Sequence, residues 1–108
     1  MTRARWWGAL AVGWALLFAV HAAMALRMHW YSVLADEAGY LGNARWLAHA
    51  GPVWPMWRSS FYSLGYPLLL APVALLFDGP REVYVGSLLV NGVLLAGLFP
   101  LLAVAVRR

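Results

Sequence analysis

The sequence predicts an all-α polytopic membrane protein with about three transmembrane helices and an external juxtamembrane amphipathic helix. Of its 108 residues, 64% are hydrophobic and only 11% are charged, and the mean hydropathy is +0.70. Soluble domains average about 45–50% apolar and about 25% charged residues, so this composition excludes a soluble globular domain and a disordered chain. The net charge of +4 comes from eight arginines scattered between apolar runs. They form no basic face of the kind that binds nucleic acid, and we expect no nucleic-acid partner.

The first predicted span covers residues 6–26. These 21 residues have no formal charge, and a helix of that length is about 31 Å long, close to the roughly 30 Å hydrocarbon core of a bilayer. Arg3 and Arg5 precede the span, which predicts a cytoplasmic N-terminus. We expect the membrane to be the cytoplasmic (plasma) membrane. A signal peptide is the alternative for this segment, but its apolar region is usually only about 7–15 residues long.

The stretch 28–60 is predicted to be an external loop that contains a helix over 36–50. Asp36 and Glu37 stand in the first turn of this helix, where carboxylates interact favourably with the helix dipole. The Gly-Pro pair that follows the segment is typical of a helix end. The helix has polar and apolar faces, so we expect it to lie along the membrane surface.

The remaining predicted spans cover 61–77 and 83–106. The first has only 17 residues and contains prolines, which imply kinks. The second has 24 residues, enough to cross with tilt, and its glycines and Asn91 favour close packing against other helices. Three spans that start inside place Arg107 and Arg108 outside, against the positive-inside tendency. Either 61–77 is re-entrant, or these arginines bind something anionic outside, or further helices set the topology.

The acidic pair Asp36–Glu37 is the sharpest chemical feature of the sequence. It could supply a general base or bind a divalent cation, and the alternative is a plain helix cap. On a helix, Asp36 shares a stripe with Tyr40 and Asn43, which can hydrogen-bond a carboxylate or a sugar and are therefore candidate substrate-binding residues. Glu37 shares its stripe with apolar residues that are better suited to packing.

Two arginines are candidates for binding a phosphate at the membrane surface. Arg45 lies in the predicted helix and Arg58 follows it, and both guanidinium groups could bind phosphate oxygens. The alternative is that they extend toward lipid headgroups. The sequence contains no cysteine, Gly-rich phosphate loop or zinc motif, and it implies no organic cofactor.

The order of these parts is more informative than any one residue. After the first span come ADEAGYLGNARWLAHAG, an aromatic stretch, FYSLGYPLLLAPVALLF and VYVGSLLVNGVLLAGLFPLLAVAVRR. This order resembles the N-terminal part of the membrane-embedded glycosyltransferases of the C superfamily. It is similar to the bacterial relatives of the dolichyl-phosphate-mannose protein mannosyltransferases and of the lipid A aminoarabinose transferase. The matching positions are Asp36–Glu37, Ala44–Arg45, Gly51, Tyr66–Pro67–Leu68 and Val90–Asn91.

The resemblance implies transfer of a sugar from a polyprenyl-phosphate-linked donor to an acceptor at the external membrane face. Asp36 would be the base that deprotonates the acceptor hydroxyl, with Glu37 beside it, and Arg45 or Arg58 would stabilise the lipid-phosphate leaving group. Members of this superfamily are several times longer, so we expect 1–108 to be a single membrane segment of a longer chain. Its partners would be the sugar donor, membrane lipids, and later or partner helices, and the purified segment alone would be inactive.

Two other classes of function remain open from the sequence. A small non-enzymatic membrane protein could use Gly-rich spans to assemble with partner helices. The front end of a transporter could line its pathway with the Pro-interrupted segment. Further hydrophobic spans downstream, with an external loop after each pair, would favour the transferase.

Overall fold

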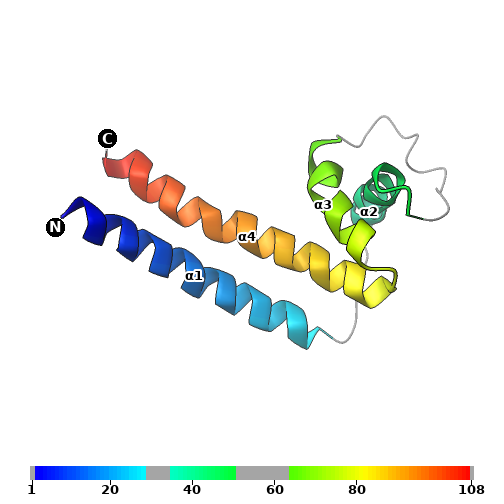
Figure 1. Ribbon diagram of the computed structural model, residues 1–108, viewed down its shortest axis with the longest axis horizontal. Coiled ribbons are helices and arrows are strands. Elements are labelled where there is room, and N and C mark those ends of the chain that lie inside the picture. Colours follow the sequence, from blue (N-terminus) through cyan, green and yellow to red (C-terminus); the bar gives the residue numbers. More distant parts are fainter. Residues whose placement is uncertain (1, 29–34, 51–63, 108) are drawn as a thin grey trace. The chain divides into compact units, whose positions relative to one another are not determined.

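The computed structural model describes residues 2–28, 35–50 and 64–107, without the side chains of Ala35 and Asp36. Four helices occupy these residues, and no strand occurs among them (Figure 1). The helices are α1 (Arg3–Arg27), α2 (Ala35–Leu47), α3 (Gly65–Leu76) and α4 (Pro80–Arg107). The chain divides into two compact units, which we call the first unit (Met1–Met28 with Leu88–Arg108) and the second unit (His29–Ser87). α4 contributes residues to both.

In the first unit, α1 and the C-terminal part of α4 run antiparallel and meet at glycines. Gly13 of α1 faces Phe99 of α4 so closely that a Cβ at this position would overlap the phenyl ring. Further along, a Cβ on Gly92 would lie 3.1 Å from the Cβ of His21. Small residues of this kind allow two helix backbones to approach. As the residue number of the contact rises along α1, it falls along α4, so the two helices are antiparallel.

The first turn of α1 and the last turn of α4 therefore lie at the same end of the first unit (Figure 1). The guanidinium of Arg107 lies 4.5 Å from the centroid of the Trp6 ring, and Arg3 and Arg5 stand just before Trp6 on α1. Arg107 therefore lies at the same end of the first unit as Arg3 and Arg5, which makes this end basic. Three spans would have placed Arg107 at the opposite end from Arg3 and Arg5.

Two helices are long and apolar enough to span a membrane, α1 with 25 residues and α4 with 28. Only 11% of the apolar window of each is buried within the structure, and Leu16 and Leu101 are 64% and 67% exposed. The core helix of a soluble protein would be mostly buried, so this exposure favours a lipid environment. α3 has 12 residues and is about 18 Å long, so the third span predicted over 61–77 is not confirmed.

Local chemistry explains the bounds of α3 and the start of α4. Pro67 lies in the first turn of α3, where a missing N–H costs no helical hydrogen bond. At the other end Phe77 adopts an extended backbone with φ −133°, and its N–H donates to the carbonyl of Val73. Pro80 then occupies the first position of α4, which suits the fixed φ of proline. α4 begins there, before the predicted residue 83.

In the second unit, α2 packs against α3, and α3 packs against the beginning of α4. Tyr40 of α2 meets Tyr66 of α3 with 5.3 Å between ring centroids. A Cβ on Gly86 would lie 2.5 Å from a methyl carbon of Val73, so glycine permits this close approach. Small residues dominate the core, whose buried members include Asn43, Ala44, Ala48, Pro67, Leu70, Ala71, Val73, Ala74, Val83 and Ser87.

α2 ends at Leu47, earlier than the predicted residue 50. His49 adopts a left-handed backbone with φ 52°. The N–H of Ala50 donates to the Arg45 carbonyl at 2.9 Å, and that of His49 donates to the Trp46 carbonyl at 3.1 Å. These two bonds form a Schellman motif. The helix stops because His49 leaves helical geometry. This end precedes the Gly-Pro pair, which lies outside the described residues.

Candidate functional site

The acidic pair lies in the first turn of α2, as the sequence predicts. The side chain of Asp36 lies outside the described residues, and that of Glu37 is half-buried. Adjacent positions on an ideal helix are about 100° apart around its axis. The roles of Asp36 as base and of Glu37 as its neighbour stay predictions.

Tyr40 lies one turn after Asp36 and links α2 to α3. Its ring and that of Tyr66 are inclined at 83°, which is the edge-to-face geometry that aromatic pairs favour. Sequence reasoning grouped Tyr40 with Asp36 and Asn43 but did not pair it with Tyr66. In the sequence, the position of Tyr66 in the Tyr-Pro-Leu motif is the feature that could have pointed to this pairing.

Asn43 is closed to solvent in this structure. It is 2% exposed, and the neighbouring Ala44 is 1% exposed. The stripe expected to bind substrate and the stripe expected to pack are therefore both buried at this level of α2. A sugar would reach Asn43 only if its neighbours moved, and its role in binding stays a prediction.

Arg45 has a structural contact at the end of α2. Its Nε donates to the carbonyl of Ala50 at 3.0 Å, and its side chain is half-buried. This bond supports the same turn that His49 forms. Arg58 lies outside the described residues.

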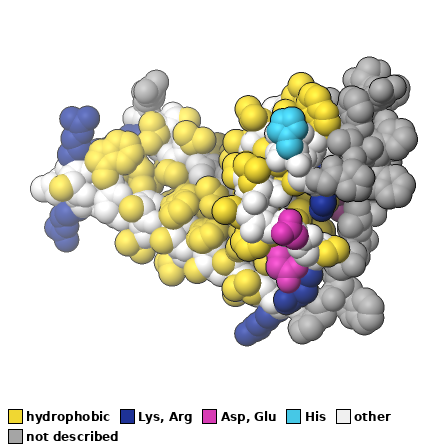
Figure 2. All heavy atoms as spheres, turned by 45° about the vertical axis from the view of Figure 1, so that its right-hand side comes forward, with side chains coloured by type: hydrophobic (Ala, Val, Ile, Leu, Met, Phe, Trp, Pro, Cys, Tyr) yellow, Lys and Arg dark blue, Asp and Glu magenta, His cyan; other side chains and the backbone are white. Residues whose placement is uncertain are grey.

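The two units differ in charge. All four acidic residues of the chain belong to the second unit, whereas the first unit contains five arginines and no acid. On the face shown in Figure 2, hydrophobic side chains cover most of the coloured surface and only a small acidic patch appears. Among the described side chains, which do not include Asp36, no three His, Asp or Glu residues gather in a way that could hold a metal ion.

The described part of the site is a helix that begins with an acidic pair and is fixed by Tyr40 and by the turn at Arg45. No buried side-chain nitrogen or oxygen among the described residues lacks a hydrogen-bond partner. Comparison of the chain with known protein families, with curated proteins and with solved structures finds no match.

Proposed function

We propose that the chain is the N-terminal portion of a membrane glycosyltransferase that uses a polyprenyl-phosphate-linked sugar donor. The observation that supports this most is the position of α2. Along the chain, α2 begins with an acidic pair and lies between α1 and α4, which are both long enough to span a membrane. It packs on the Tyr-Pro-Leu segment of α3. The superfamily resemblance rests on the same order of motifs.

The topology follows from the two long helices. The basic end of α1 and α4 lies in the cytoplasm, in accordance with the positive-inside tendency. The second unit lies between α1 and the C-terminal part of α4 along the chain, so it stands at the external face. In this proposal α3 does not cross the bilayer, and 61–77 is a re-entrant or interfacial segment of the plasma membrane.

The proposed reaction is a single displacement. A carboxylate oxygen of Asp36 takes the proton of an acceptor hydroxyl as the acceptor oxygen bonds to the anomeric carbon. The bond between that carbon and the donor phosphate oxygen breaks at the same time, and polyprenyl phosphate leaves. Arg45 and Arg58 offset the negative charge on the leaving phosphate. One displacement inverts the configuration of the sugar.

The assignment of the base to Asp36 is tested by two isosteric substitutions at the gene's own locus. Asp36→Asn should lower sugar transfer in isolated membranes by about 10²–10⁴-fold, the usual effect of removing a general base. Glu37→Gln should cost less, because adjacent positions on a helix are about 100° apart and cannot serve one acceptor hydroxyl equally. Asn also caps helices well, so loss of activity in Asp36→Asn would not come from a lost cap.

Both variants must be compared at matched membrane abundance, measured by immunoblot against an epitope tag. The substrate is a radiolabelled polyprenyl-phosphate sugar, and the readout is label transferred to the acceptor fraction. Near-parental transfer by Asp36→Asn would end the catalytic assignment.

A further inference from the structure

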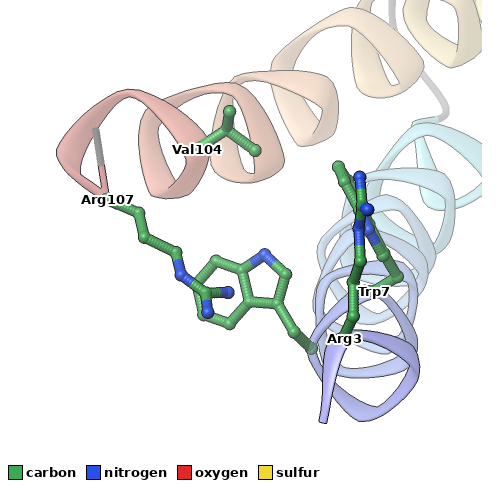
Figure 3. Close-up of a pocket in the computed structure, with 5 residues that line it drawn as sticks. Arg3, Trp7, Val104 and Arg107 are labelled. Carbon is green, nitrogen blue, oxygen red and sulfur yellow. The ribbon is translucent and has the colours of Figure 1, made fainter. Parts of the chain in front are cut away.

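An open hollow of about 430 Å³ lies at the basic end of the first unit (Figure 3). Its lining residues are Arg3, Trp6, Trp7, Val104 and Arg107. Figure 3 shows Arg3 and Trp7 on α1, facing Val104 and Arg107 on α4. The hollow is thus built by both helices of one unit, at the end where their first and last turns meet.

The first unit contains no acidic side chain that could pair with the two arginines of this hollow. The Arg107 guanidinium lies over the Trp6 ring at 4.5 Å, a cation–π contact that orients it beside the hollow. Arg3 stands on the opposite helix. Since the first unit contains no Asp or Glu, it supplies no side-chain carboxylate to balance them. A phosphate group matches the planar donors of guanidinium and would supply the missing negative charge.

A second hollow of about 420 Å³ shares Trp6 and Arg107 with the first. Its other lining residues are all apolar: Phe99, Leu102, Ala103 and Val106. A basic hollow therefore adjoins an apolar one across the Trp6–Arg107 pair. That combination suits an amphiphile with a phosphate at one end and a hydrocarbon chain at the other. A free phosphate ion would leave the apolar hollow unused.

We propose that this end of α1 and α4 is a binding site for an anionic phospholipid. The phosphate binds between Arg3 and Arg107, and one acyl chain lies along Phe99 and Ala103. Tryptophan and arginine at headgroup level suit this depth of a bilayer. The site lies in the first unit and does not depend on the sugar-transfer proposal, whose residues are all in the second.

The site is tested by native mass spectrometry of the purified 108-residue chain with phosphatidylglycerol and with phosphatidylcholine. Phosphatidylglycerol should bind more tightly. Arg3→Gln and Arg107→Gln should each weaken its apparent affinity about fivefold, the change expected for about 1 kcal/mol per arginine near anionic lipid. Arg27→Gln is the matched control, because Arg27 is the basic residue in the last turn of α1, at its other end. It should change the affinity less than about twofold.

A second pair of variants tests the acyl-chain part of the site. Ala103→Phe fills the apolar hollow and should weaken binding of long-chain phosphatidylglycerol but not of its six-carbon analogue. Ala105 is exposed and lines neither hollow, so Ala105→Phe should have no effect. Circular dichroism shows whether each arginine variant folds. If one does not, the Ala103 and Ala105 variants still test whether the lipid binds at this site.

Three results would overturn the proposal. Equal affinity for phosphatidylcholine and phosphatidylglycerol would show that the site does not select an anionic headgroup. An equal loss in Arg27→Gln would show general charge attraction rather than a site. Displacement of the lipid by millimolar inorganic phosphate would show a site for the free ion.

Discussion

Among the described non-glycine residues, His49 alone has a positive φ, at 52°. The left-handed region costs a residue with a Cβ about 1–2 kcal/mol, and glycine avoids most of that cost. We predict that His49→Gly raises the free energy of unfolding by about 0.5–1 kcal/mol once the greater entropy of unfolded glycine is subtracted. The measurement is SDS titration in mixed micelles, followed by tryptophan fluorescence. His49→Ala removes the imidazole but keeps the Cβ, and equal stability of the two variants would contradict the explanation.

At this scale the sequence predicts which residues are chemically interesting better than it predicts their contacts. The acidic pair falls in the first turn of α2 because its charges suit that position. The pairing of Tyr40 with Tyr66 could not be predicted, because it depends on how two helices pack. The hydrogen bond from Arg45 to the Ala50 carbonyl depends on the left-handed backbone of His49. A histidine in the sequence does not predict that conformation.

At the scale of elements, the antiparallel contact of α1 with α4 depends on Gly13. A Cβ there would overlap the Phe99 ring, whereas a Cβ on Gly8 would meet nothing within 4 Å. Gly13→Ala should destabilise the first unit by about 1 kcal/mol, the low end of the overpacking cost, because the overlapped atoms are the outer end of the partly exposed Phe99 ring. Gly8→Ala lies on the same helix and should be neutral or slightly stabilising. The same SDS titration compares them, and matching losses in both variants would refute close packing at Gly13.

The long helices could be predicted because apolar run length alone sets them, and α1 and α4 enclose the predicted runs 6–26 and 83–106. The short ones could not be delimited in this way. α3 stops at Leu76 because Phe77 turns extended. The apolar sequence alone does not show that Leu64 and Phe77 flank the helix rather than belong to it. Composition indicates that a segment is apolar, while caps and turns decide its length.

At the scale of the whole molecule, α1 and α4 predict a two-span topology that cysteine labelling can test. The chain has no native cysteine, so single-cysteine variants give a clean signal. Thr2→Cys and Val106→Cys should react with a membrane-impermeant maleimide only after the membrane is disrupted, because both lie at the basic end. Asp78→Cys should react in intact cells, because Asp78 belongs to the second unit, which the proposed topology places at the external face. Labelling of Val106→Cys but not of Thr2→Cys in intact cells would contradict the two-span topology and favour three spans.

The basic end of the first unit also couples the protein to the electrical potential of the membrane. Moving one elementary charge across a membrane potential of 100 mV costs about 2.3 kcal/mol. Arg3, Arg5 and Arg107 lie at one end of the helix pair and Arg27 lies at the other. Inverting the pair against an inside-negative potential of that size moves a net two of these charges outward and would cost about 5 kcal/mol. An energised membrane therefore acts as a latch on the orientation of α1 and α4, and collapsing the potential with an ionophore during insertion should release more inverted molecules.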